Sequence, residues 1–258
     1  KGGYEHFMLK EIHEQPKVLT DTMRPRLVFE GGVPVDIKFD ELCFDEKWKE
    51  AKRIVIVACG TAYHAGVVAK YVFEQLARVP VVVDVASEFR YRNPILCKDD
   101  IFIVISQSGE TADTLAALRL AKQNGVHVTA ITNCVGSTVS READDVVYTW
   151  AGPEIAVAST KAYTTQLMCL SMLALKAAFI KGTIYASDYK KYLCELNSIP
   201  EKVQQILEDK ASIQRFVSKN YNKQKVFFIG RQYDSATSLE CALKLKEVSY
   251  MHSEAFAA

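Results

Sequence analysis

The middle part of the chain alternates short apolar runs with segments of helical periodicity. Five nearly continuous apolar runs are typical of strands that are buried on both faces of a parallel sheet. They lie at residues 53–60, 81–85, 101–106, 126–133 and 145–150. Helical segments follow the first and third runs, at 63–77 and up to about Lys122. This repeat predicts an α/β fold: a doubly wound five-stranded parallel sheet with helices on both faces.

The segments around this sheet suggest four parts. A helix expected at 161–181 is so apolar that it must be buried on most sides, and two amphipathic helices are expected at about 187–196 and 200–219. We predict an N-terminal helical and connector segment, a first sheet domain, a helical bridge and the start of a second domain. Their boundaries are 1–50, 51–182, 183–222 and 223–258.

The last part repeats the pattern of the first strand. KVFFIGRQ, from Lys225, has the strand-then-glycine form of RIVIVACG, from Arg53, and a helix is expected at 233–250. One strand and one helix cannot form a sheet by themselves. We therefore expect the sequence to be a piece of a longer protein that is cut inside a second domain.

The stretch IFIVISQSGETADT, at 101–114, holds the main candidate site. A buried strand runs into the hydroxyl-rich turn 106–111, and a helix follows it. The first N–H groups of a helix have no partner inside the helix and favour an anion. The turn therefore predicts a phosphate site built from neutral donors. The alternative is a plain N-cap, in which one Ser satisfies the helix and the other side chains face water.

Two further polar loops are candidates of lower specificity. Thr61 follows the first strand, and because the carboxyl ends of parallel strands form one crevice, it is expected to share a ligand with the 106–111 turn. Cys59 fits a small core residue better than a nucleophile, and His64 fits a helix surface equally well. In the loop before the long apolar helix, Ser159 is interpreted as an N-cap.

Glu240, Lys244 and Glu247 lie at positions i, i+4 and i+7 of an expected helix. This spacing places them within about 40° on one helix face. A carboxylate beside an ammonium group that is sheltered from water provides a base with a tunable pKa. The alternative is a solvated ion pair that contributes only about 0.3–0.5 kcal/mol.

Composition and absent motifs narrow the function. The 32 Lys and Arg residues nearly balance the 31 Asp and Glu residues, which argues against nucleic acid as a partner. No nucleotide-binding glycine motif or G-x-S-x-G elbow is present. The seven cysteines are scattered, without metal-ligand spacing, and no signal segment or uninterrupted membrane span is visible. We expect a cytoplasmic protein that uses no metal, no organic cofactor and no membrane.

Four motifs together resemble a known family. ACGTAYHAG, SQSGETADT, AGPEIAVASTKAYTTQL and LECALKLKEVSYMHSEA occur in the order and spacing of the sugar isomerase (SIS) half of glutamine:fructose-6-phosphate amidotransferases, which make glucosamine 6-phosphate. The resemblance extends over nearly the whole chain. It implies an isomerase part with two SIS domains, of which 51–182 is the first, preceded by a glutaminase domain that supplies ammonia. It also implies a homodimer as the working form.

The resemblance assigns roles by motif. Ser106, Gln107, Ser108 and Thr111 would hold the phosphate of fructose 6-phosphate or glucosamine 6-phosphate. The positions of Thr61, Ala62, Val157 and Ser159 would line the sugar. Glu247 would move a proton between C1 and C2, with Lys244 assisting at the sugar hydroxyls and Glu240 supporting that helix face. The implied activity is that of an isomerizing aminotransferase.

The sequence departs from this family at three positions. Ala62 stands where Ser is frequent, and Gln232 and Cys241 stand where Gly is common. The family's ring-opening histidine would follow Ala258 and its Schiff-base lysine lies further on, so we expect this fragment alone to be inactive; His252 is not that histidine. Two alternatives remain: a phosphosugar-sensing SIS domain without catalysis, and a simple aldose–ketose phosphosugar isomerase.

Overall fold

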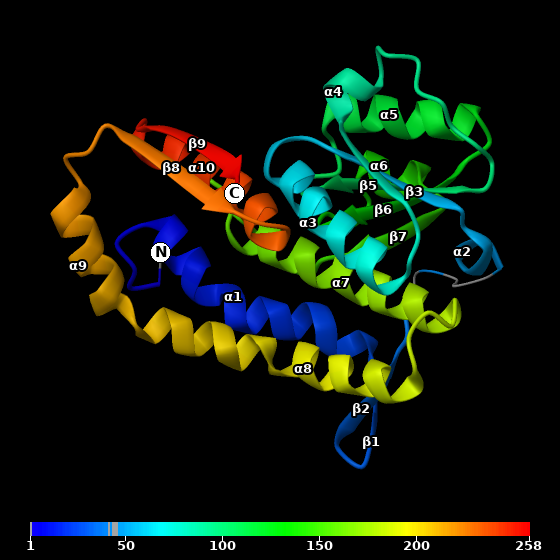
Figure 1. Cartoon of the computed structure of the whole chain (residues 1–258), viewed down its shortest axis with the longest axis horizontal. Coiled ribbons are helices and arrows are strands. Elements are labelled where there is room, and N and C mark those ends of the chain that lie inside the picture. The colour runs from blue at the N-terminus through cyan, green and yellow to red at the C-terminus, as the bar shows by residue number, and fades with distance from the viewer. Residues whose placement is uncertain (1, 41, 43–45) are drawn as a thin grey trace.

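The computed structural model describes residues 2–40, 42 and 46–258, and its centre is a five-stranded parallel sheet (Figure 1). The strand order is β4-β3-β5-β6-β7, and all four neighbouring pairs are parallel. The strands are β3 (Arg53–Ala58), β4 (Val81–Val85), β5 (Asp100–Ser106), β6 (His127–Thr132) and β7 (Asp145–Tyr148). The predicted parallel sheet is confirmed, and each strand lies within about two residues of its expected bounds.

Helices cover both faces of the sheet, as predicted. One face packs against α3 (Gly60–Leu76) and α7 (Lys161–Ile180) through the side chains of Ile54 and Ile56. The other face packs against α5 (Ala112–Gln123) through Val55 and Val57, with α4 (Ala86–Phe89) and α6 (Thr138–Glu142) beside it. Successive residues of a strand point to opposite faces, so a continuous apolar run fills both cores.

The helix α7 is the central element of its layer. By length and composition it could cross a membrane, and 61% of its most apolar window is buried inside the protein, which is also what a core helix shows. Lys176 lies within this helix, and its ammonium group donates to Asp36. α1 (Phe7–Met23) and α8 (Ala186–Glu208) pack outside α7.

The N-terminal part contains a hairpin that the sequence analysis did not predict. After the short 3-10 helix Arg24–Arg26, the strands β1 (Leu27–Glu30) and β2 (Val33–Ile37) pair in antiparallel orientation, and α2 (Glu46–Glu50) follows. Only a connector and the short helix were expected there. The strands are short and β2 carries Pro34, so their alternation is too brief to be distinguished from a loop.

The helical bridge is also different from the prediction. α8 continues through Pro200 instead of ending near residue 196, and the interruption lies at Asp209, before α9 (Lys210–Asn220). Proline removes one backbone donor from a helix. Here Leu196, Ile199 and Val203 pack against the core on either side of it, and this packing keeps the helix continuous.

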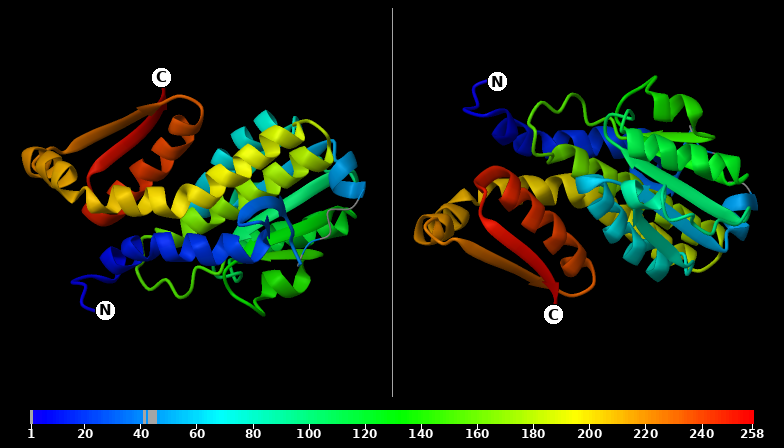
Figure 2. Two further views of the ribbon diagram at one scale, coloured as in Figure 1. Left: turned by 90° about the horizontal axis from the view of Figure 1, so that it is seen from below. Right: turned by 90° about the horizontal axis from the view of Figure 1, so that it is seen from above.

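The C-terminal part is a complete βαβ unit, whereas only one strand and one helix were expected. β8 (Lys225–Gly230) and β9 (His252–Ala257) form a parallel pair, connected by α10 (Tyr233–Ser249). β9 was missed because HSEAFA is half polar. Figure 2 shows the unit beside the end of α8, and α10 contacts α3 of the main body.

The turn between β8 and α10 has strict backbone requirements. A Cβ atom at Gly230 would lie 2.4 Å from the backbone carbon of Asp234, so the position requires glycine. Gln232 adopts φ 51° and ψ −117°, a conformation that L side chains rarely adopt. Glutamine therefore stands at a position whose geometry favours glycine.

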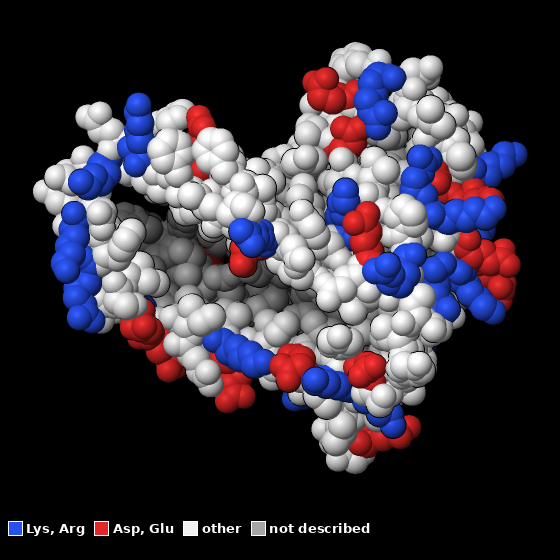
Figure 3. Space-filling view, viewed as in Figure 1, with Lys and Arg blue, Asp and Glu red and all other residues white. Residues whose placement is uncertain are grey.

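Figure 3 shows the charged side chains on one face of the molecule. Basic and acidic residues are interspersed over the body that contains the sheet. The ion pairs of this body include Arg119 with Glu142 and Lys122 with Asp144.

One polar cluster fixes the hairpin to the helical layer, and its replacement gives a first prediction. Asp36 accepts from Lys176 Nζ at 2.7 and 2.9 Å and from the Tyr189 hydroxyl at 2.7 Å. Burial raises the pKa of Asp36, but these hydrogen bonds outweigh it and keep the pKa below its ordinary 3.8. We expect Asp36→Asn to lower the free energy of unfolding at pH 7 by about 1–2 kcal/mol, measured by denaturant titration.

The pH dependence of this loss follows from the lowered pKa. A carboxyl group whose folded pKa is depressed stabilises the fold above its unfolded pKa, and the contribution disappears as pH falls through the folded pKa. The difference between Asp36→Asn and the unmutated chain should therefore be full at pH 7 and shrink below about pH 4. An equal difference at pH 7 and pH 3 would contradict this account.

Candidate functional site

A cavity lies at the carboxyl edge of the sheet, between the ends of β3 and β5. Its volume is about 240 Å³. The chain leaves β3 toward one face through α3 and leaves β5 toward the other through α5, so the cavity lies where the winding direction reverses, the usual ligand position in such sheets. Its walls are formed by Cys59, Thr61, Ala62, Ile105, Ser106, Gln107, Ser108, Thr111, Thr114, Ser159 and Gln166.

The hydroxyl-rich turn forms one wall of this cavity. Ser106 Oγ accepts from the N–H of Gly109 at 3.0 Å and lies 3.0 Å from Thr111 Oγ1. Ser108 Oγ accepts from the N–H of Glu110 at 3.2 Å. A Cβ atom on Gly109, whose φ is 67°, would lie 2.1 Å from Ser137 Oγ, so only glycine fits the turn.

The start of α5 behind this turn is not capped by a side chain. Thr111 is the N-cap residue, and its hydroxyl makes no capping hydrogen bond to the helix. The plain N-cap interpretation is therefore wrong. The turn presents three hydroxyls and a side-chain amide to a helix N-terminus that favours negative charge, an arrangement suited to an anion.

The loop before α7 contributes Ser159 to the cavity, but not as an N-cap. The Ser159 hydroxyl donates to Glu154 Oε2 at 2.8 Å. Glu154 Oε1 accepts from the N–H groups of Thr160 and Ala162 at 2.9 and 3.2 Å, so Glu154 caps α7. The N-cap prediction for Ser159 is wrong because a carboxylate five residues earlier satisfies the helix. Val157 lies outside the cavity with a fully exposed side chain.

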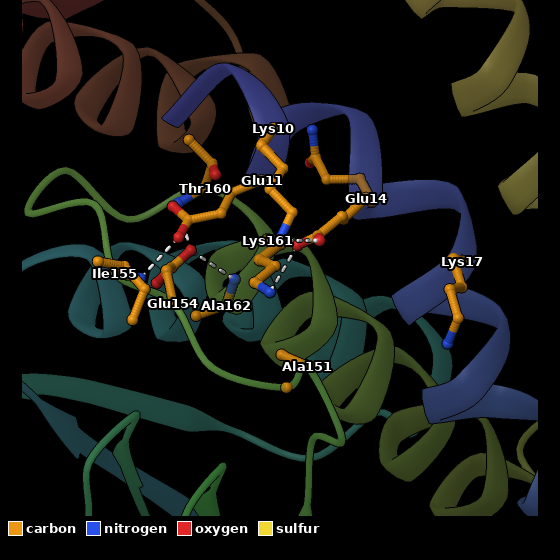
Figure 4. Close-up of polar contacts among 12 residues, drawn as sticks. Lys10, Glu11, Glu14, Lys17, Ala151, Glu154, Ile155, Thr160, Lys161 and Ala162 are labelled. Carbon is orange, nitrogen blue, oxygen red and sulfur yellow. Dashed lines mark hydrogen bonds and ion pairs between the residues drawn. The ribbon is translucent and has the colours of Figure 1, made fainter. Parts of the chain in front are cut away.

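The helix α1 holds this loop in place (Figure 4). The carboxylate of Glu11 accepts from the N–H groups of Ile155 at 2.6 Å and Ala156 at 3.2 Å. One turn further, Glu14 Oε2 accepts from Lys161 Nζ at 2.8 Å. The hydrogen bond from buried Lys161 lowers the pKa of Glu14 and outweighs the opposing effect of burial. The cavity loop thus depends on carboxylates of an element far away in the sequence.

The three charged residues of α10 lie together and close to the cavity. Lys244 Nζ is 2.6 Å from Glu247 Oε2 and 3.3 Å from Glu240 Oε1. It also donates to Thr61 Oγ1 at 3.0 Å, and Thr61 donates in turn to Glu240 Oε1 at 3.0 Å. Because Thr61 lines the cavity, it connects the α10 cluster to the cavity wall.

Glu240 is the most sheltered member of this cluster. Its side chain is 6% exposed, and its second oxygen lies 2.7 Å from Nδ1 of His64 on α3. The solvated ion-pair interpretation is therefore wrong for Glu240. Burial, and after it the charge of Glu240, raises the pKa of Tyr163. The same two causes raise the pKa of Cys241, and burial is again the larger one. The charge of Glu240 thus acts on a side chain of α7 and on a neighbour in its own helix.

The sequence analysis missed two polar residues of this region, Thr114 and Gln166, and left the role of His64 open. His64 is in contact with Glu240, and Thr114 and Gln166 line the cavity. Thr114 lies one helical turn after Thr111, and this spacing in the sequence indicates that the two side chains share a helix face. Nothing local marks Gln166, because it lies within an apolar helix. Within the ranges that the structure describes, no group of three His, Cys, Asp or Glu residues could hold a metal ion.

Comparison with known proteins identifies the fold family. The sequence profile of the SIS domain matches residues 48–176, which cover β3 to most of α7. The chain belongs to the SIS domain family. The SIS profile includes every cavity-lining residue, whereas the cluster on α10 lies beyond it.

Individual relatives of this SIS protein extend over its whole length. A crystallised C-terminal domain of glucosamine-fructose-6-phosphate aminotransferase from Francisella tularensis is 41% identical, with a TM-score of 0.93 over 100% of this chain and 71% of that chain. Glutamine–fructose-6-phosphate aminotransferases (isomerizing) of Caldanaerobacter subterraneus and Clostridium tetani are each 58% identical over 259 aligned residues. The chain spans 42% of the length of each of these two relatives.

The contact between α1 and the cavity loop gives a second prediction. Glu11→Ala removes the acceptor of two loop N–H groups, so we expect it to lower the free energy of unfolding by about 2–4 kcal/mol. Hydrogen exchange at Ile155 and Ala156 should accelerate at the same time. The matched control on α1 is Asp21→Ala, which breaks an exposed pair with Lys17 and should cost less than about 1 kcal/mol. Unchanged exchange in Glu11→Ala would show that Glu11 does not hold the loop.

Proposed function

We propose that this chain binds fructose 6-phosphate and glucosamine 6-phosphate, as the isomerase part of a glutamine–fructose-6-phosphate aminotransferase. The observation that carries the proposal is the cavity between β3 and β5, whose wall combines hydroxyls, an amide and a helix N-terminus. The names of the relatives, which match the whole chain at up to 58% identity, support the choice of sugar phosphate.

The phosphate group belongs in the turn of Ser106, Gln107, Ser108 and Thr111. A dianion among neutral donors is held by several charge-assisted hydrogen bonds, each contributing about 1.5–3 kcal/mol. The turn contains no Lys or Arg, so binding depends on the number and direction of donors. Such a site is specific for a small, fully surrounded anion.

The sugar extends from this turn toward Thr61, Ser159 and the α10 cluster. Glu247, one third exposed, is the base that moves a proton between C1 and C2 of the open-chain sugar. Lys244, 2.6 Å from it, stabilises negative charge on a sugar oxygen. Glu240 is a positioning residue, because its contacts with Thr61, His64 and Lys244 fix the ammonium group beside the cavity.

Two proposed sugar-lining positions differ from the others. Ala62 lines the cavity with a methyl group, so it supplies no hydrogen bond. The side chain of Val157 faces outward, so its contribution to the sugar comes from the backbone of the loop. Thr61 and Ser159 carry the polar contacts on this side.

The activity of the whole protein rests on more than this chain. The proposed amination uses ammonia from a glutaminase domain, and the proposed working form is a cytoplasmic homodimer. Within the chain, we retain 1–50 as a connector segment, 51–182 as the first SIS domain, 183–222 as a bridge and 223–258 as part of a second SIS domain. The fragment by itself is proposed to bind the sugar phosphate without completing the reaction.

Ligand-induced stabilisation tests this function. Fructose 6-phosphate or glucosamine 6-phosphate should raise the melting temperature, since a ligand at 100 times its Kd adds about 2.7 kcal/mol to the free energy of unfolding. Ser106→Ala with Ser108→Ala should abolish the rise. The matched control, Ser198→Ala with Ser218→Ala, removes two hydroxyls from α8 and α9 and should retain it. Absence of any rise in the unmutated chain at millimolar ligand would refute the proposal.

A further inference from the structure

Two buried polar side chains in the wall of the cavity have no hydrogen-bond partner among the described residues. They are Thr114 on α5 and Gln166 on α7, which are 1% and 2% exposed. The unpartnered atoms are the hydroxyl oxygen of Thr114 and the amide oxygen of Gln166. A buried polar atom without a partner costs about 1–3 kcal/mol, so native proteins rarely retain one without a reason.

The position of the pair supplies a reason. α5 covers one face of the sheet and α7 covers the other, yet both side chains line the same cavity at its carboxyl edge. Thr114 lies three residues after Thr111, on the same side of α5 as the anion-binding turn. Gln166 lies in the second turn of α7, after the loop that carries Ser159.

We propose that Thr114 and Gln166 are two further binding residues for the sugar phosphate, and that the ligand satisfies their unpartnered atoms. This inference rests on the proposed function of the cavity. The Thr114 hydroxyl donates to an oxygen of the phosphate group, which extends the row of donors from Ser106 to Thr111 by one helical turn. The Gln166 amide oxygen accepts from a hydroxyl of the sugar, because a phosphate dianion has no hydrogen to donate.

The chemistry of the pair also limits the ligand. A site that buries polar groups discriminates against molecules that leave those groups unpaired, since the loss of hydration is then not compensated. Gln166 requires a donor from the ligand and Thr114 an acceptor. A polyhydroxylated phosphate ester supplies both at the two ends of one small molecule, whereas an apolar phosphate ester supplies only the acceptor.

The experiment compares replacements that remove each polar atom while keeping its shape. Thr114→Val and Gln166→Met should each weaken fructose 6-phosphate binding roughly fivefold or more, measured by calorimetric titration. Thr129→Val is the matched control: Thr129 Oγ1 on β6 is also buried and unpartnered, but it does not line the cavity. Its affinity for fructose 6-phosphate should equal that of the unmutated chain.

Stability without ligand separates binding from a structural role. If the ligand is the partner, Thr114→Val should have a melting temperature equal to or above that of the unmutated chain, because a buried unsatisfied hydroxyl is removed. A lower melting temperature with unchanged affinity would overturn the inference in favour of an internal structural contact. Unchanged affinity in both Thr114→Val and Gln166→Met overturns it as well.

Failure of this inference is distinguishable from failure of the proposed function. If the unmutated chain binds no fructose 6-phosphate, the proposed function fails. If it binds, Ser106→Ala with Ser108→Ala abolishes binding, and both new variants bind normally, only the roles of Thr114 and Gln166 fail. Lower affinity in the two new variants and normal affinity in Thr129→Val supports both proposals.

Discussion

The parallel pairing of β3 with β5 is the constraint on which the rest of the structure depends. Six residue pairs, from Arg53 with Asp100 to Ala58 with Ile105, place the ends of the two strands side by side. The chain then turns to opposite faces, through α3 and through α5, so the loops that follow the strands diverge and leave a crevice. The hydroxyl-rich turn and Thr61 line this crevice, and Lys244 contacts it through Thr61.

Glu240 and Lys244 join the C-terminal unit to this crevice. Glu240 receives contacts from Thr61 and His64 of the SIS domain and from Lys244 of its own helix. Removal of one partner from a sheltered ion pair leaves a charge without compensation, so these contacts hold their geometry more strictly than surface pairs do. The βαβ unit therefore presents Lys244 to the cavity in a defined position, although its β8–β9 sheet has only two strands.

The parts of the fold that the sequence could predict are those governed by local periodicity. The five strands of the main sheet are buried on both faces, so each is a nearly continuous apolar run that the sequence alone predicts as a strand. The hairpin of β1 and β2 and the strand β9 were missed because short or half-polar strands lack such a run. The continuation of α8 through Pro200 depends on tertiary packing, which overrides the local preference of proline.

The same distinction applies to the candidate site. The 106–111 turn was recognisable because its donors are adjacent in sequence. The cap of α7 by Glu154 was not, since a serine next to the helix was the stronger local signal. The support of that loop by Glu11, 144 positions away, has no sequence signature at all. Sequence patterns therefore located the hydroxyl-rich turn that lines the cavity, whereas the contacts that hold its surroundings required the fold.

The carboxylate of Glu11 has a thermodynamic consequence for the N-terminal segment. The loop that it holds also carries Ser159, so the conformation of α1 and the shape of the cavity are parts of one equilibrium. Coupling between two such parts is reciprocal. If a ligand at Ser159 orders the loop, it strengthens the attachment of α1 to the loop. A restrained α1 then increases the affinity of the cavity for that ligand by the same factor. The first helix of the chain is thereby an energetic partner of the site, although none of its side chains lines the cavity.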